Sequence, residues 1–379
     1  MKLEERTKIL RDFDADEQEV AELLAYNQNI FQQNDIKTLP QFPLASESHI
    51  AVWQEYVTQA KTQSSWETLK NVLVQLKFPI QSGISQTASY RGATLKGIEP
   101  NLTNGLILQK PEELQLTIHQ SLAGKIPVLL TTNREDFVSL VRAITKRNEP
   151  VAIPDSMGAC MVAGYNNWDR IRRYRRKWSA NNIDNSESAW SRAFKQLIAH
   201  KELYQDKFII LSDGFYSNVA PEELGISKTE WKRLSLTIRL EHECTHYFTR
   251  RVFNSMQNNL LDEFIADYRG IVAATGSYKA DWFLRFMGLE SFPHYREGGR
   301  LQNYRGQLSE GAFTILQKLV KSAAENLEDF DRNYAHQLKT TENQTTMLVA
   351  LTSVTIEELA SSHNYLKKKM ESQLSTCSN

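Results

Sequence analysis

Cysteine is scarce in this chain of 379 residues. Three are present, Cys160, Cys244 and Cys377. An odd and widely spaced set is unlike a disulfide framework, which needs paired cysteines. The first residues are charged and contain no apolar signal core. Both observations lead us to expect a reducing, cytoplasmic setting.

Long apolar runs and a surplus of charge are also missing. No stretch approaches the roughly 20 apolar residues of a membrane span, so we expect no membrane partner. Lysine plus arginine number 45, and aspartate plus glutamate number 45. Because the charges balance, no net field favours nucleic acid, and nucleic-acid binding is not expected. The length allows two or three compact units.

Four regions are expected along the chain: a helical N-terminal region at 1–80, an α/β region at 81–220, a pair of helices with the loop that follows them at 221–305, and a helical C-terminal region at 306–379. Within the second region, 79–105 predicts loop with short strands. A strand at 126–132, a helix at 134–147 and a strand at 151–153 form a predicted strand–helix–strand unit. No glycine-rich phosphate motif follows either strand, so a nucleotide site there is not favoured.

One segment carries a local charge surplus. Six of the eleven residues at 168–178 are basic, and the aromatic and apolar residues between them recur every three to four positions, which predicts a basic amphipathic helix. The functional interpretation is a site for nucleic acid, or for an acidic side chain or C-terminal carboxylate of a substrate. The alternative is a solvated face whose arginines pair with acidic neighbours. The balanced charge of the whole chain favours the alternative.

The strongest motif is His-Glu-x-x-His, which begins at His242. Successive residues on a helix are about 100° apart, so His242 and His246 lie on one face, one turn apart, where both imidazoles can hold one ion. Glu243 falls on the flank of that face, where its carboxylate can take a proton from an attacking water. A chance match is the alternative. The predicted helix supports the motif, because Ser227 can cap its start and Glu230 can complete a capping box.

A second helix offers a third ligand. It is predicted from Asn259 to about Thr275, with Gly276 as its stop. Within it, the carboxylate of Glu263 can complete a metal site. Asp267, one turn further on, is placed to accept the outer N–H of a ligating histidine.

Together the two segments resemble the gluzincin metallopeptidases, the superfamily of thermolysin. About 30 residues carry the resemblance, in the patterns His-Glu-x-x-His and Glu-x-x-x-Asp-x-x-Gly that begin at His242 and Glu263. It implies that Zn²⁺ is held by His242, His246 and Glu263, that Glu243 is the general base and that Asp267 orients a ligating histidine. There are two departures: Asp262 stands where the relatives of thermolysin usually have asparagine, and the 16-residue spacer after His246 is shorter than in thermolysin.

The resemblance implies a helix-rich α+β fold with a zincin-like core: a small mixed sheet with an edge strand, beside the catalytic helix pair. The expected function is zinc-dependent hydrolysis of an amide, in first place a peptide bond of a peptide or protein substrate. A strand is predicted at 207–212, and the segment 208–219 could be the edge that pairs with substrate, although an ordinary core strand explains the same residues equally well. Candidates for stabilising the oxyanion are His294, Tyr295 and Tyr304. The alternative function is a non-catalytic, metal-containing binding or scaffold protein that acts through the basic helix at 168–178.

Overall fold

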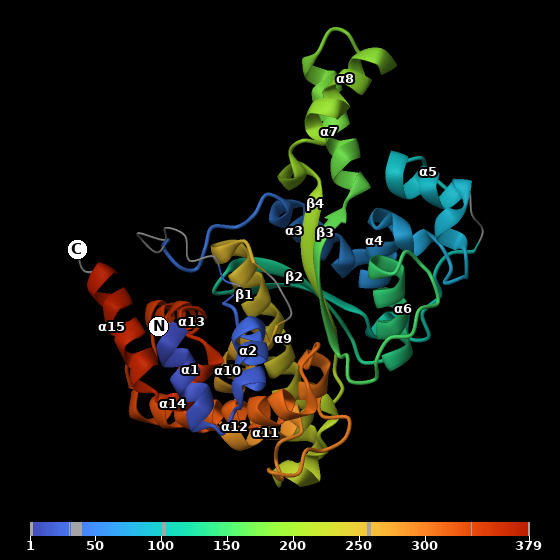
Figure 1. Cartoon of the computed structure of the whole chain (residues 1–379). Helices are drawn as coiled ribbons and strands as arrows, with labels where there is room; N and C mark the ends of the chain where they lie inside the picture. Colours follow the sequence, from blue (N-terminus) through green and yellow to red (C-terminus); the bar gives the residue numbers. More distant parts are fainter. Residues whose placement is uncertain are drawn as a thin grey trace. The chain divides into compact units, whose positions relative to one another are not determined.

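The fold is helix-rich α+β with one small mixed sheet, as the sequence predicted (Figure 1). The computed structural model describes residues 3–29, 31, 40–100, 104–255, 259–334 and 336–377. It divides into two compact units: a helical unit of Met1–Leu44 with Phe215–Asn379, and a sheet unit of Ala45–Gly214. The predicted N-terminal region 1–80 is therefore shared between the two units. Among the described residues, no helix is long and apolar enough to cross a membrane.

The sheet unit contains four strands, β1 (Gln115–Ser121), β2 (Gly124–Thr131), β3 (Ala159–Asn166) and β4 (Gln205–Ser212), in the order β1-β2-β4-β3. The first two pair antiparallel as a hairpin. Strand β4 pairs with a strand on each side. It is parallel to β2, where Ile209 of β4 lies opposite Val128, and antiparallel to β3, where Ile209 lies opposite Met161. Because β4 is hydrogen-bonded on both sides, it is an interior strand, and its predicted role as a substrate-binding edge is wrong.

Two helices of this unit, α3 (His49–Gln63) and α6 (Arg134–Thr145), pack against the strands. Its other elements are α4 (Ser65–Val72), α5 (Ala88–Lys96), α7 (Trp168–Asn181), α8 (Glu187–Leu197) and the short 3₁₀ turns η1 (Val74–Lys77), η2 (Ile84–Gln86), η3 (Pro111–Glu113) and η4 (Lys201–Leu203). Trp53, Tyr56 and Phe208 form an aromatic centre of the core, with Phe137 of α6 in the same cluster. All four side chains are fully buried, so the sheet unit has a hydrophobic core of its own.

Two predictions for this unit are wrong. No strand forms at 151–153, where Pro150 and Pro154 flank the segment and Val151 is exposed, because proline cannot donate to a strand ladder. The segment 79–105, expected to be loop with short strands, contains α5, which begins after the N-cap Thr87 and ends at Gly97. Its weak amphipathic pattern hid the helix.

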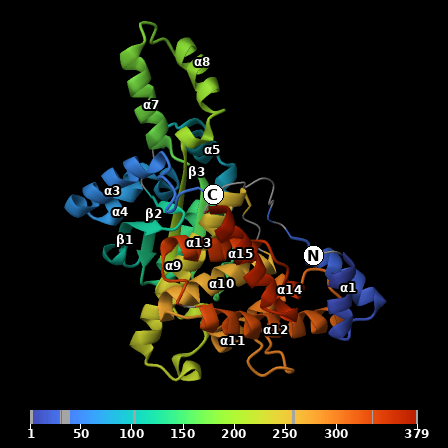
Figure 2. The same ribbon diagram turned by 90° about the vertical axis from the view of Figure 1, so that its left-hand side faces the viewer.

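The predicted basic helix is α7, and it forms a helical hairpin with α8 that projects from the strands of its unit (Figure 1 and Figure 2). Aromatic rings hold the hairpin together. The Trp190 ring of α8 lies 5.5 Å from Trp178 and 6.4 Å from Tyr174, and Phe194 stacks 6.1 Å from Trp168. The aromatic face predicted for 168–178 is therefore a packing surface.

The helical unit contains the predicted helix pair, α9 (Lys228–Phe253) and α10 (Leu260–Thr275). Its other elements are α1 (Leu3–Asp12), α2 (Glu17–Tyr26), η5 (Tyr216–Asn218), η6 (Pro221–Leu224), α11 (Ala280–Met287), η7 (Arg300–Tyr304), α12 (Glu310–Tyr334), α13 (Thr341–Thr352), α14 (Ile356–Ser361) and α15 (Asn364–Cys377). The start of α9 is capped by Ser227, whose side chain accepts from Glu230 N. Asn259 caps α10 and Gly276, at φ 84°, ends it. These boundaries confirm the predicted helix pair.

Close approach of α9 and α10 depends on Gly270. A Cβ added there would lie 2.8 Å from the carbonyl oxygen of Ile238 and 3.0 Å from its side chain. Both distances are below normal van der Waals contact, so a larger residue would push the helices apart. The glycine of the motif thus sets the spacing that lets side chains of the two helices meet.

Candidate metal centre

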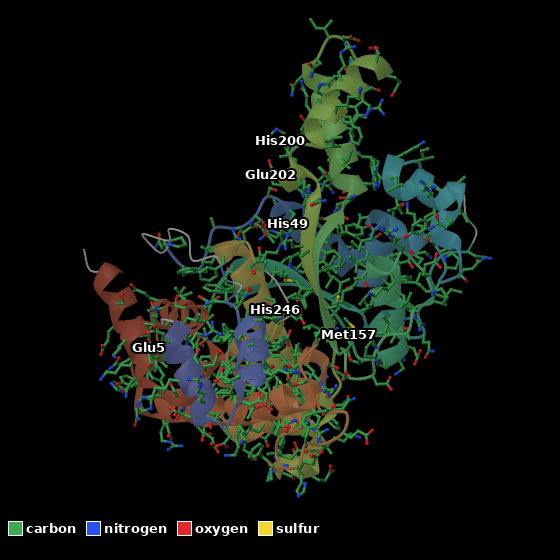
Figure 3. The ribbon with its side chains drawn as sticks, viewed as in Figure 1. Glu5, His49, Met157, His200, Glu202 and His246 are labelled. Carbon is green, nitrogen blue, oxygen red and sulfur yellow. The ribbon has the colours of Figure 1, made fainter. Side chains whose placement is uncertain are left out.

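Three side chains of the helix pair meet at one point. The ligand atoms of His242 and His246 on α9, and of Glu263 on α10, all lie within 4.8 Å of one another. The two Nε2 atoms are 3.1 Å apart, and each lies 3.4 Å from a carboxylate oxygen of Glu263. All three residues are buried; His246 is labelled in Figure 3. We refer to these residues as the tripod.

The spacing of the tripod fits a tetrahedral metal ion. Ligands about 2.0–2.1 Å from zinc at tetrahedral angles lie about 3.3 Å from one another. The three separations between ligand atoms in the structure, 3.1, 3.4 and 3.4 Å, agree with that value. Two imidazoles and a carboxylate are also a donor set that zinc accepts, with a fourth position left open. Among the described residues this is the single cluster of its kind.

Each histidine of the tripod is held by its own carboxylate. His242 Nδ1 lies 2.8 Å from Asp267 Oδ1, the partner predicted from the sequence. His246 Nδ1 lies 3.0 Å from Asp262 Oδ2, and the other oxygen of Asp262 accepts from the Thr249 hydroxyl at 3.3 Å. A proton on each Nδ1 leaves each Nε2 with a lone pair directed at the tripod, so both rings are set in the tautomer that binds a metal.

Asp267 is itself held by two further residues. The Tyr216 hydroxyl donates to Asp267 Oδ1 at 2.6 Å and lies 2.9 Å from His242 Nδ1. Arg300 pairs with the second oxygen of Asp267 and donates to the Tyr216 hydroxyl at 3.0 Å. Next to Tyr216, Ser217 has a φ of 51° and its hydroxyl accepts from Arg300 at 3.1 Å. A strained turn and a half-buried arginine therefore fix the carboxylate that orients His242.

The electrostatics of the buried cluster favour a cation. Asp262, Glu263 and Asp267 carry three negative charges and Arg300 carries one positive charge, so neutral histidines leave a net charge of −2. Uncompensated charge of that size is costly in a buried site. A divalent cation neutralises it.

The same carboxylates also raise the pKa values of both histidines, because they stabilise the protonated imidazole. Burial lowers the pKa of His242, but its hydrogen bonds to Asp267 and Glu263 outweigh burial and raise that pKa to about 9. The pKa of His246 is likewise raised well above its usual value, against the effect of burial, by Asp262 and Glu263. Without a metal ion the rings thus attract protons, and a metal that needs neutral imidazole ligands would release them.

One of the three oxyanion candidates lies at the tripod. The Tyr304 phenol lies near Glu263 and Arg300; burial raises its pKa, the Arg300 charge opposes the rise and the Glu263 charge adds to it, so the phenol stays protonated as a donor. Its backbone oxygen accepts from the Tyr26 hydroxyl of α2 at 2.6 Å. A helix of the N-terminal segment therefore holds the position of Tyr304.

The other two candidates are placed elsewhere. The Tyr295 hydroxyl donates to Gly299 O at 2.6 Å and accepts from Gln302 N at 2.9 Å, so it closes the loop that leads into η7. His294 is exposed, and its backbone pairs with Ser291. Neither side chain is brought to the tripod, because the loop's own hydrogen bonds determine their positions.

Glu243 is half-buried on α9, beside His242 in the sequence. The helical rotation of about 100° per residue places it on the flank of the face that carries the tripod. This is the position expected for a base that serves the site.

Local sequence patterns predict no role for Asp262, Tyr216 and Arg300. Asp262 is a departure from the thermolysin pattern, and its place just before Glu263 is the signal that its carboxylate can reach the second histidine. Tyr216 and Arg300 lie 26 residues before and 58 residues after His242. No local pattern connects such distant residues, so only the fold reveals them.

We expect the two orienting aspartates to tune metal affinity. Asp267→Asn and Asp262→Asn each keep a hydrogen-bond acceptor but remove a charge behind one imidazole, so zinc affinity should fall roughly 10- to 100-fold. Competition against a chromophoric chelator measures this change. Asp281→Asn, at an exposed acid of α11, is the matched control and should bind zinc like the parent. An unchanged affinity in both aspartate variants would show that the imidazoles are held by other means.

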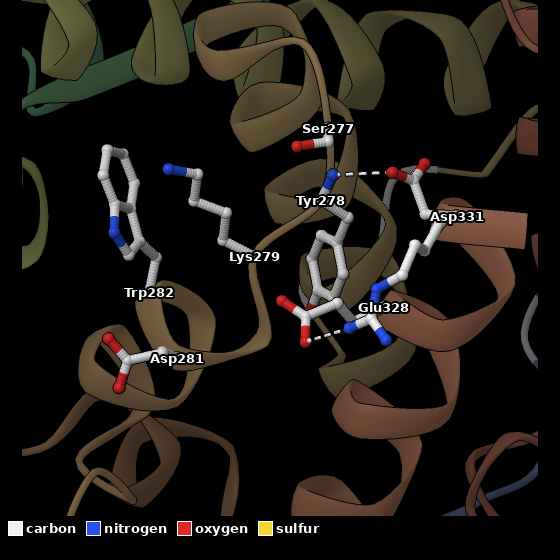
Figure 4. Close-up of a pocket in the computed structure, with 8 residues that line it drawn as sticks. Ser277, Tyr278, Lys279, Asp281, Trp282, Glu328 and Asp331 are labelled. Atoms are coloured by element: carbon white, nitrogen blue, oxygen red, sulfur yellow. Dashed lines mark hydrogen bonds and ion pairs between the residues drawn. The ribbon is translucent and has the colours of Figure 1, made fainter. Parts of the chain in front are cut away.

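A second cavity in the helical unit, of about 410 Å³, offers no comparable convergence (Figure 4). Its charged groups already have partners. Asp331 accepts from Tyr278 N at 2.8 Å and from the Tyr268 hydroxyl at 2.9 Å, and Glu328 lies 3.4 Å from Arg332. These contacts join α10, α12 and the turn before α11, which indicates a structural role.

Comparison with known proteins identifies a family but no function. The family of unknown function DUF7005 matches residues 8–363. No curated protein and no solved structure matches the chain.

Proposed function

Since the chain belongs to the family of unknown function DUF7005, we infer its function from the site and propose that it is a zinc-dependent hydrolase of the gluzincin type. The proposed reaction is hydrolysis of an amide, in first place a peptide bond of a peptide or protein substrate. The single observation that carries the proposal is the tripod of His242, His246 and Glu263 at tetrahedral spacing, with a separate aspartate behind each imidazole.

A zinc ion held by the tripod would supply Lewis acidity, which lowers the pKa of water and polarises a carbonyl group. The chain's own residues supply the remaining functions. Glu243 takes the proton of the attacking water and passes it to the leaving amine. The protonated phenol of Tyr304, beside Glu263, donates a hydrogen bond to the oxyanion that develops on the substrate.

Tyr216, Asp267 and Arg300 do not need to touch substrate in this scheme. Their hydrogen bonds keep the His242 ring in one tautomer and one orientation, which is the preorganisation that metal sites require. We further propose a reducing, cytoplasmic setting, which is compatible with Cys160 and Cys244 as thiols.

The alternative is a metal-containing binding or scaffold protein that acts through the basic helix α7. Four of the six basic residues of α7 pair with carboxylates, namely Arg170, Arg172, Arg173 and Arg175. This pairing leaves little unmatched charge for a large polyanion, so we place the hydrolase first.

Digestion of a peptide library, read by mass spectrometry, tests the proposal. The zinc-loaded protein should cleave peptides, a chelator such as 1,10-phenanthroline should abolish cleavage, and one equivalent of zinc should restore it. Bound zinc without cleavage of any peptide would contradict the peptidase proposal and favour the scaffold. Cleavage that persists in the chelated protein would contradict the role of the metal.

A further inference from the structure

A groove in the sheet unit lies between α3 and the basic helix α7. Its cavity volume is about 490 Å³, within the range of roughly 300–1,000 Å³ that is typical of ligand pockets. Residues from both helices line it, among them Val52, Glu55, Tyr174, Arg176 and Lys177, and Leu203 closes one wall. We call it the α3–α7 groove.

Two cations of the groove have no acidic partner. The other four basic residues of α7 are neutralised in pairs: Arg170 with buried Asp206, Arg172 with Glu99, Arg173 with Glu55 and Asp169, and Arg175 with Glu187. Arg176 and Lys177 are exposed, and neither forms an ion pair within 4 Å with any residue that the structure describes. The charge available to a partner is therefore concentrated at one point of the groove.

Apolar and aromatic surface lies beside these cations. Tyr174 is 36% exposed and Leu203 is 37% exposed, although both line the groove, and Val52 is half-buried on the α3 wall. The base of α7 is firmly held, because Arg170 donates to the carbonyl oxygen of Glu202 at 2.9 Å and to the Ser48 hydroxyl at 3.0 Å. A partner thus meets a rigid wall with both charge and apolar area.

The sheet unit has a surplus of basic residues, although the complete chain is neutral. It contains 21 lysines and arginines against 16 aspartates and glutamates, whereas the helical unit contains 24 against 29. This surplus supports an anionic partner for the groove.

We propose that the α3–α7 groove binds an acidic peptide segment, whose carboxylates pair with Arg176 and Lys177 while an apolar side chain packs against Val52 and Leu203. A peptide fits better than nucleic acid, because two unpaired cations are few for a phosphate backbone, whose binding depends on many such contacts. The inference is independent of the proposed function, because it concerns residues of the sheet unit alone.

Fluorescence anisotropy with a fluorescein-labelled peptide of alternating glutamate and leucine tests the inference. All proteins carry Glu243→Gln, so that the probe stays intact if the chain is a peptidase. The groove variant is Arg176→Ala with Lys177→Ala. The matched control is Arg192→Ala with Lys195→Ala, which removes the same charge from exposed positions of α8.

We expect saturable binding that weakens roughly 10-fold, or about 1.4 kcal/mol, in the groove variant and stays within about 2-fold in the control. Binding should also weaken at high salt, since charge pairs contribute to it. The inference is overturned if no saturable binding occurs, if both variants lose equal affinity, if a glutamine–leucine peptide binds as tightly, or if an oligothymidylate binds more tightly than the acidic peptide. Thermal melting should show that both variants keep the stability of the parent.

Discussion

Glu263→Ala is expected to abolish zinc binding and, with it, hydrolysis. Glu263 is the only ligand that α10 contributes to the tripod, and its two oxygens lie 3.4 Å from the two histidine Nε2 atoms. Without it, two imidazoles on one helix remain, which hold a zinc ion too weakly to survive dialysis. The loss of affinity should exceed the roughly 10- to 100-fold expected for Asp262→Asn or Asp267→Asn.

Glu230→Ala is the control for this experiment, because it removes an exposed carboxylate near the start of α9. It should retain zinc, and circular dichroism should show that both variants keep their helices. A Glu263→Ala protein that binds zinc as tightly as the parent would rule out Glu263 as the third ligand. The gluzincin assignment would then be wrong even if His242 and His246 bind metal.

Glu243→Gln is expected to separate metal binding from catalysis. The substitution preserves the shape of the side chain and leaves the tripod complete, so zinc content should stay near that of the parent. It removes the general base, so kcat should fall by roughly 10²-fold or more. Elemental analysis and peptide hydrolysis on the same sample measure the two effects.

The three acidic positions should therefore differ in a defined order. Zinc affinity is expected to be highest in Glu243→Gln, intermediate in Asp267→Asn and lowest in Glu263→Ala. If Glu243→Gln hydrolyses peptides at the rate of the parent, another group is the base. If it loses zinc, Glu243 contributes to the metal site itself.

The helix pair and the tripod could be predicted because their signals are local. Side chains four residues apart on a helix share a face, and the caps Ser227 and Asn259 precede the helices that they begin. The role of Glu263 as third ligand could be predicted because α10 follows α9 after a short connection, and helices that are close in sequence usually pack as neighbours. The structure brings His242, His246 and Glu263 together, as that reasoning expected.

Contacts between distant segments could not be predicted from one sequence. The interior place of β4 depends on β2 and β3, which lie far from it in the chain. The support of Asp267 by Arg300 and the hydrogen bond from Tyr26 to the backbone of Tyr304 join segments with no shared pattern. Tyr295 shows that residue type alone is not enough. A tyrosine hydroxyl can stabilise an oxyanion, but the hydroxyl of Tyr295 is hydrogen-bonded within its own loop.

The central claim is that the tripod holds one divalent ion, and the zinc content of the purified chain tests it most directly. Elemental analysis after dialysis should find about one zinc per chain, and the metal-free protein should take up about one equivalent in a titration. A protein that carries no transition metal, and takes up none when titrated, would contradict the account.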